Sequence, residues 1–157
     1  MDANRFGRSL AAGLCGSTAH LCLMSLKSWT GFLPSFQPYA DLQRLLGVLV
    51  GTSVHPLVAW GLSFLNGAVV LGFVFGRAYA VLPGRNGAAK GIVFGLLGWV
   101  IMGCVFFPLL GHGLFAMQAG LGVLPALFSL LMLLTYSVVM GVAYSALLPK
   151  ETPPHHQ

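Results

Sequence analysis

Charged side chains are scarce in this chain. Among its 157 residues there are 8 Lys and Arg and 3 Asp and Glu, which together make up 7% of the sequence. A water-soluble domain has roughly 25% charged residues. Apolar residues account for 57% and there are 21 glycines, so too little polar surface remains to cover a soluble globule of this size. The sequence therefore predicts an all-α integral membrane protein.

The shortage of acidic residues excludes several kinds of chemistry. Asp2, Asp41 and Glu151 are the only carboxylic residues, and all three lie outside the long apolar runs. Paired-carboxylate catalysis, carboxylate-bound magnesium and proton coupling through an intramembrane acid have no residues to carry them. GxSxG, P-loop and HExxH motifs are also missing. We expect a protein that is not an enzyme.

Neither a cysteine framework nor a basic cluster is present. Cys15, Cys22 and Cys104 lie inside apolar runs without CxxC or zinc-finger spacing, which argues against disulfides. The 8 basic residues stand singly between apolar runs, so there is no basic stripe to follow a phosphate backbone. We expect a lipid bilayer as partner and no nucleic acid.

Four apolar runs are long enough to cross a bilayer, which requires about 20 helical residues. We predict a single four-transmembrane-helix bundle over residues 1–149 and a polar cytoplasmic tail over 150–157. The first run is too long for a cleaved signal peptide. The predicted spans are residues 7–29, 56–81, 88–110 and 125–148.

A short amphipathic helix is predicted between the first two spans, at residues 41–53. Asp41 offers an N-cap, and four leucines recur at helical spacing opposite Gln43 and Arg44. A straight helix that continued into the second span would be about 60 Å long, twice the hydrocarbon thickness. Gly51 and Pro56 must therefore bend the chain, which leaves the first helix in the membrane interface.

Two connecting segments have a distinctive composition. Residues 31–39 contain two prolines and are predicted to be a loop. Residues 111–122 carry no formal charge and include four glycines, GHGLFAMQAGLG. We expect this second segment to lie in the interface or to dip back into the membrane. Pro108 is expected to weaken the last turn of the third span.

The basic residues predict the orientation. Four spans place both termini and the turn between spans two and three on one side of the membrane. That side carries six cations, and the other side carries only Lys27 and Arg44. Because positive charge accumulates on the cytoplasmic side, both termini are predicted to be cytoplasmic. The six are Arg5, Arg8, Arg77, Arg85, Lys90 and Lys150.

Small residues recur at helical spacing in the spans. In lipid, helices associate where small residues let their backbones approach closely. We interpret these rows as packing contacts inside the bundle; the alternative is that Gly91 and Gly95 dock a partner helix. The predicted packing glycines are Gly16, Gly72, Gly76, Gly91, Gly95 and Gly141.

One polar or aromatic residue lies near the middle of each span: His20, Asn66, Trp99 and Tyr136. Polar groups at this depth are costly to bury and hence informative. The structural interpretation is a hydrogen-bonded cluster in which His20 bonds to Asn66, Tyr136 or a backbone carbonyl. The functional alternative is a site for a proton, a small ligand or a cofactor.

His55 and His112 form a second group. Both fall at the outer ends of their spans, where two imidazoles can bind a transition metal or haem. Their spacing is not distinctive, because His55 precedes a proline and His112 stands between two glycines. Structural roles at the bend and in the loop are the competing interpretation.

From Pro83 onward a series of motifs resembles a family of small uncharacterised bacterial inner-membrane proteins, a domain of unknown function. The resemblance covers roughly residues 57–148 and implies four helices and an inner-membrane location, but no activity. Members often carry a histidine before the last Tyr-Gly pattern, where this chain has Thr135 and Tyr136; this weakens any metal or haem role implied by the family. The motifs are Leu-Pro-Gly at 82–84, Lys90-Gly91, Phe94-Gly95, Trp99, Pro108, Gly111, Gly113-Leu114-Phe115, Tyr136, Gly141 and Tyr144.

Taken together, these features predict a structural or accessory subunit of a larger membrane assembly, or a homo-oligomer. The competing hypothesis is a ligand-handling protein. Such a protein would be a small-solute permease or a redox subunit with haem b or quinone, built on His20 or on the pair His55 and His112.

Overall fold

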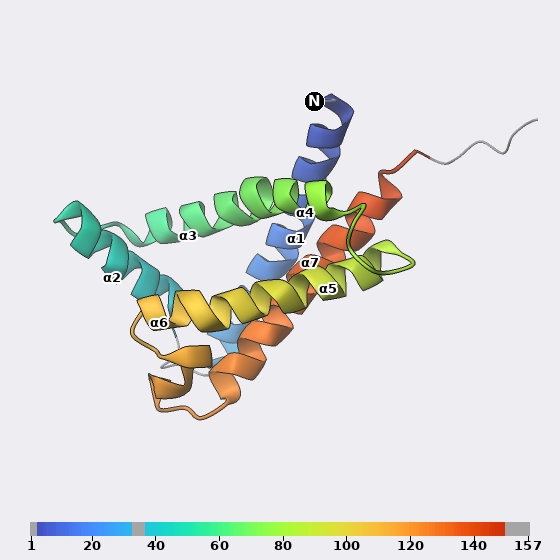
Figure 1. Ribbon diagram of the computed structural model, residues 1–157. Helices are drawn as coiled ribbons and strands as arrows, with labels where there is room; N and C mark the ends of the chain where they lie inside the picture. The colour runs from blue at the N-terminus through green and yellow to red at the C-terminus, as the bar shows by residue number, and fades with distance from the viewer. Residues whose placement is uncertain (1–2, 33–36, 150–157) are drawn as a thin grey trace, which may run out of the picture.

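The computed structural model describes residues 3–32 and 37–149 (Figure 1). Within these residues every regular element is helical, and four helical stretches are long and apolar enough to cross a membrane. The predicted all-α fold with four spans is confirmed, and the chain is a multi-pass membrane protein in contact with the lipid bilayer. The predicted tail at 150–157 lies outside the described residues. The four stretches are Asn4–Thr30, Pro56–Ala78, Gly87–Leu109 and Leu124–Ala146.

The first and last spans are single α-helices, α1 (Ala3–Thr30) and α7 (Leu124–Ala146). The two middle spans each contain a π-helical segment. The second span consists of α3 (Pro56–Leu65), η1 (Asn66–Leu71) and α4 (Gly72–Ala78). The third consists of α5 (Gly87–Ile101), η2 (Met102–Phe106) and α6 (Phe107–Leu109).

Local sequence signals explain where the middle spans begin. Pro56 stands in the first turn of α3, and the ring of His55 accepts a hydrogen bond from the Leu57 N–H. At the start of α5 the side chain of Asn86 accepts a hydrogen bond of 2.8 Å from the Ala89 N–H. Both side chains satisfy a backbone donor that a helix start leaves without an intrahelical partner.

The π-helical turn η2 carries the third span past Pro108. A proline inside a helix has no N–H to donate and its ring crowds the carbonyl four residues earlier, here that of Cys104. The wider turn lets the Phe107 N–H bond to Met102 O, five residues back. The helix therefore continues to Leu109, where the sequence had suggested only a weakened end.

Helix α7 packs against both α1 and α5, and α1 packs against the second span (Figure 1). Glycines and serines lie at these contacts. A Cβ added to Gly72 would lie 2.6 Å from the Ser9 carbonyl oxygen, and one added to Gly16 would lie 2.8 Å from that of Tyr136. Only small residues allow backbones to come this close, which is how helices pack in the absence of a hydrophobic drive.

Aromatic rings join the second and third spans at one end of the molecule. The Phe75 side chain is fully buried, with the rings of Phe94 and Tyr144 at 5.2 and 5.8 Å. The ammonium of Lys90 donates to the Tyr79 carbonyl oxygen at 2.5 Å and lies 4.4 Å from the centre of its ring. Lys90 therefore caps the C-terminal end of the second span, where a cation is favoured.

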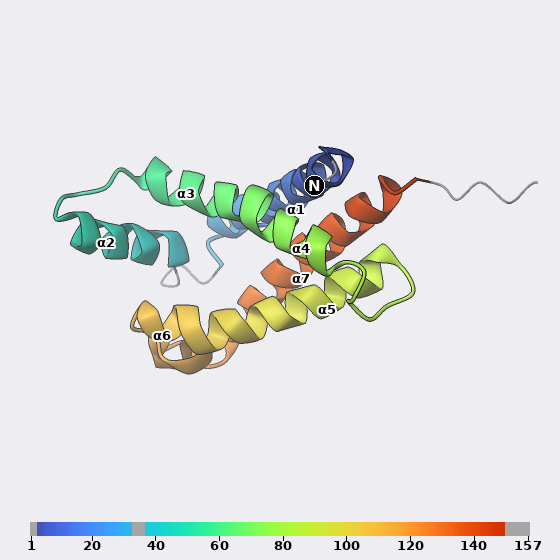
Figure 2. The same cartoon turned by 45° about the horizontal axis from the view of Figure 1, so that its top comes forward.

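At the opposite end the second and third spans diverge, and α2 (Pro38–Val50) lies there (Figure 2). The sequence predicts Asp41 as the N-cap of this helix, and that prediction is wrong. The helix already begins at Pro38, inside the predicted loop, and Gln37 is its N-cap. Proline is well suited to a first helical turn because the missing N–H has no intrahelical partner there. The helix ends at Gly51, whose φ of 76° is the left-handed conformation that glycine adopts easily.

The segment between the third and fourth spans folds back along the third span. It forms the short helix η3 (Leu114–Ala119), in which Phe115 and Ala116 have φ values of 51° and 59°. Such values cost energy for residues with a side chain and persist only when packing imposes them. Here the Phe115 ring fills the space beside Gly103 and lies 4.7 Å from the Trp99 ring.

Candidate functional site

Tyr136 makes the central polar contact of the bundle. Its hydroxyl is buried and donates to the carbonyl oxygen of Gly67 at 2.6 Å. Gly67 belongs to the π-helical turn η1, and the same carbonyl accepts the backbone N–H of Gly72. A carbonyl oxygen has two lone pairs and can accept both. The contact ties α7 to the second span across α1.

Asn66, the neighbour of Gly67, points away from this contact. Its side chain is exposed, and it lies among the outward apolar side chains of the second span. Within the part of the chain that the structure describes, its amide has no hydrogen-bond partner. An exposed amide near the middle of a span is unusual, because lipid offers it nothing to bond to. The surrounding exposed residues are Leu62, Leu65, Val69 and Val70.

Trp99 bonds outside the predicted cluster as well. Its indole N–H donates to the carbonyl oxygen of Ala126 at 3.0 Å, in the first turn of α7. A buried indole N–H usually finds an acceptor, and here the Ala126 carbonyl oxygen satisfies it. Trp99 thus joins α5 to α7 and, through its ring contact with Phe115, to the loop between them.

His20 bonds to Tyr39 of α2. Its Nε2 and the Tyr39 hydroxyl are 3.1 Å apart, and the ring also makes a hydrogen bond with the backbone of Met132 in α7. The Tyr39 hydroxyl has a further hydrogen bond with Ser63, and its ring stacks on Trp60 at 4.0 Å. Burial raises the pKa of the Tyr39 phenol above its ordinary value, and the Ser63 bond opposes this shift. A chain of polar contacts therefore links four helices.

Of the four mid-span residues, His20, Trp99 and Tyr136 make their hydrogen bonds in three different places, and Asn66 makes none within the described residues. Of the three partners predicted for His20, neither Asn66 nor Tyr136 bonds to it; its bonds are to the Tyr39 hydroxyl, which was not predicted, and to the backbone of Met132, a partner of the third predicted kind. Tyr39 was missed because it lies next to a proline, in a stretch that its composition marks as a loop. The signal available was a tyrosine two residues before the predicted start of the amphipathic helix, close enough to belong to its first turn.

A second polar contact holds α2 to the loop between spans three and four. His112 Nε2 and Asp41 Oδ2 are 2.7 Å apart, and an Arg44 guanidinium nitrogen lies 3.5 Å from the other oxygen of Asp41. Gln43 donates to the Val54 carbonyl oxygen at 2.6 Å. Although no residue of α2 is buried, the helix is tied to its neighbours by these contacts and by Tyr39.

His55 and His112 therefore have separate local roles. His55 caps α3 and is exposed, whereas His112 bonds to Asp41. Among the described residues no group of three His, Cys, Asp or Glu side chains is close enough to hold a metal ion. These contacts give no positive support to a shared metal or haem site at the two histidines.

The predicted packing glycines all lie at contacts within the chain. Gly91 and Gly95 face Ser137 and Leu133 of α7, which supports the interpretation as packing contacts inside the bundle over the alternative that this pair docks a partner helix. Gly141 meets the Gly87 backbone from the other side of the same contact. The remaining three, Gly16, Gly72 and Gly76, lie between α1 and its neighbours α7 and α4.

This arrangement defines a multi-pass helical membrane protein whose close backbone contacts are satisfied internally and whose polar side chains mainly join its own helices. The chain belongs to a family of unknown function, DUF6789, which matches residues 3–155. The resemblance to an uncharacterised family is thereby confirmed, and it extends over nearly the whole chain. No curated protein and no solved structure matches the chain significantly.

Proposed function

We propose that this chain is a non-catalytic protein of the bacterial inner membrane that serves as an accessory subunit of a larger membrane assembly. The observation that carries the proposal is the outward amide of Asn66 in the middle of the second span. Its partner is a transmembrane helix that offers a hydrogen-bond donor or acceptor at the same depth.

The energetic argument concerns a polar group in lipid. A buried polar group without a hydrogen bond costs about 1–3 kcal/mol by mutational measurements, and lipid supplies no donor or acceptor. Hydrogen bonds between membrane helices recover about 0.6–2 kcal/mol. A helix laid against Asn66 therefore gains a bond that the isolated chain lacks within its described residues.

The shape of the bundle supports the same choice of surface. The small-residue face of the second span is already used, because Gly67, Gly72 and Gly76 lie against α1 and α7. The opposite face carries Asn66 among larger apolar side chains, with Leu65 56% and Val70 52% exposed. A partner there makes side-chain contacts rather than a close backbone approach.

The distribution of cations supports a cytoplasmic location for both termini. Arg5, Arg8, Arg77, Arg85 and Lys90 belong to the ends of helices, or the turn, on one side of the bundle, whereas Lys27 and Arg44 belong to the other. Positive charge is retained on the cytoplasmic side of bacterial membranes.

The competing ligand-handling role gains no comparable observation. His20 is engaged by Tyr39 and the Met132 backbone, and the Tyr136 hydroxyl is engaged by a backbone carbonyl. A haem or quinone at these residues would have to displace contacts that join the helices.

The proposal is tested by purifying the tagged protein from its native membrane in mild detergent and quantifying the associated subunits by mass spectrometry. We expect Asn66→Leu to lower the amount of a stoichiometric partner about threefold to tenfold, the equivalent of one interhelical hydrogen bond. Asn66→Gln keeps the amide and should retain the partner.

Leu57→Ala is the matched control, because Leu57 lies on the same span and is 71% exposed but apolar. It should leave the complex unchanged. Equal recovery of the partner with Asn66→Leu and with Leu57→Ala contradicts the proposal, as does a wild-type protein that remains a single chain after cross-linking in the intact membrane.

A further inference from the structure

Basic side chains border one end of the molecule, where the first span begins and the second ends. Arg5 and Arg8 stand in the first turns of α1, and Arg77 stands in the last turn of α4. These positions are at the ends of the membrane-crossing stretches Asn4–Thr30 and Pro56–Ala78, which is the level of lipid headgroups. Arg5 and Arg77 are exposed, and Arg8 is half-buried.

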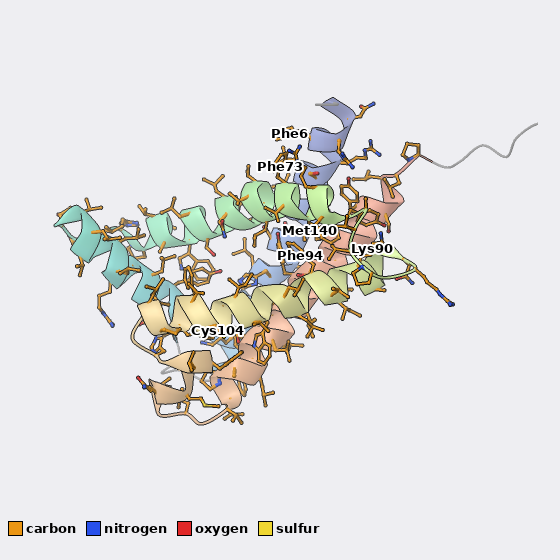
Figure 3. All side chains as sticks on the ribbon, in the orientation of Figure 1. Phe6, Phe73, Lys90, Phe94, Cys104 and Met140 are labelled. Atoms are coloured by element: carbon orange, nitrogen blue, oxygen red, sulfur yellow. The ribbon has the colours of Figure 1, made fainter. Side chains whose placement is uncertain are left out.

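An aromatic pair lies beside these arginines. The rings of Phe6 in α1 and Phe73 in α4 are 6.5 Å apart, and Figure 3 shows the two side chains close together at this end of the molecule. Phe6 is 45% exposed, so the pair forms part of the outer surface. The guanidinium carbon of Arg77 lies 5.3 Å from the centre of the Phe73 ring. The ring therefore holds the guanidinium at the boundary between the apolar surface and the headgroup level.

No acidic side chain balances this charge within the described residues. Among the described residues the single carboxylate is that of Asp41. It belongs to α2, at the opposite end of the second span (Figure 1), and is paired with His112 and Arg44. Asp2 precedes Arg5 in the sequence and lies outside the described residues. The Arg8 Nε donates to the Asn4 carbonyl oxygen, which leaves the rest of its guanidinium available to an anion.

We propose that this end of α1 and α4 binds the headgroup of an anionic phospholipid. Arg77 contacts the phosphate with its planar guanidinium, and Arg5 and Arg8 add positive charge at the same level. An acyl chain of the same lipid lies along the Phe6 and Phe73 rings. A lipid fits this surface better than a soluble anion because the cations border an exposed apolar pair at a membrane boundary.

The test measures lipid binding by the full chain in nanodiscs. The protein is placed in phosphatidylcholine discs, and phosphatidylglycerol is titrated in while the retained lipid is counted by native mass spectrometry. Each basic residue near a membrane surface contributes about fivefold to the attraction for anionic lipid. We expect Arg77→Gln to weaken phosphatidylglycerol binding about fivefold and Phe73→Leu to weaken it as well, because the ring positions the guanidinium.

Arg44→Gln is the matched control, since Arg44 is likewise an exposed arginine and lies at the other end of the molecule. It should leave binding unchanged, and all variants should unfold at the wild-type temperature in pure phosphatidylcholine. Equal effects of Arg77→Gln and Arg44→Gln overturn the proposal, because lipid binding would then depend only on the net charge of the protein and not on a site at this end. Loss of bound lipid upon addition of inorganic phosphate at equal concentration would instead assign the site to a free anion.

Discussion

Replacement of Gly91 by alanine tests whether backbone contact between α5 and α7 holds the bundle together. A Cβ at Gly91 would overlap the carbonyl oxygen of Ser137 and approach the Ser137 carbonyl carbon and the Val138 Cα, both at 2.9 Å. These are backbone atoms of α7 that cannot rotate away. Gly98, on the same helix, offers a matched control: an added Cβ there meets only the tip of Leu133, at 4.0 Å.

The expected magnitudes follow from two opposing effects. Alanine is favoured over glycine inside a helix by about 0.5–1 kcal/mol. An extra methyl group in a filled contact costs about 1–3 kcal/mol. Gly98→Ala has only the first effect and should be neutral or stabilising. Gly91→Ala has both, so it should be less stable than Gly98→Ala by about 1–3 kcal/mol.

The free energy of unfolding of both variants should be measured in the same detergent or bicelle, by steric trapping or by titration with a denaturing detergent. Equal stabilities of the two variants would refute the inference that α5 and α7 touch through their backbones. A stable Gly91→Ala variant that loses only a partner protein would return Gly91 to the role of an external docking residue.

Three further predictions concern single polar groups. Tyr136→Phe removes the hydroxyl bonded to the second span and should lower the free energy of unfolding by about 0.5–1.5 kcal/mol in the same assay. Ser137→Ala should be neutral or stabilising, because the buried Ser137 hydroxyl has no hydrogen-bond partner within the described residues, whereas Ser129→Ala loses a bond of 2.8 Å and should destabilise. Burial raises the pKa of Tyr39, because the folded state holds the phenol in its neutral form. The free energy of unfolding should therefore be constant below the ordinary pKa of 10.0 and should fall as the pH rises from there toward the raised pKa. Fluorescence of the stacked Trp60 should follow this loss, and Tyr39→Phe should abolish its alkaline transition.

The number and approximate positions of the spans could be predicted because they depend only on length and apolarity. A run of about 20 apolar residues has few alternatives to a membrane helix. The start of α2 was misjudged because Asp41 is a good N-cap in isolation. Proline in the first turn competes with it, and Asp41 instead bonds to His112, which is distant in sequence. Such a pairing depends on how the chain folds back, which residue spacing does not encode.

The arrangement of the mid-span residues was harder to predict than their depth. Depth follows from counting residues, whereas the direction of a side chain changes by about 100° with each residue of an α-helix. The spans are apolar on all sides, so no polar face fixes their rotation. In addition, the π-helical turn at Asn66–Leu71 changes the rotation within the second span. Gly67 therefore meets Tyr136, while Asn66 faces outward.

Because the glycines form packing contacts inside the bundle, an effect on association with another protein must be distinguished from an effect on folding. Close backbone contacts already join α1, α5 and α7, so a substitution at Gly91 or Gly95 acts on folding before it acts on assembly. Asn66 contributes no contact of this kind and is exposed. Its replacement by leucine should leave the free energy of unfolding of the single chain within about 0.5 kcal/mol of the wild type, as expected for an outward position. A loss of assembly at unchanged stability is therefore the signature of the Asn66 surface, and a loss of both together is the signature of the glycine contacts.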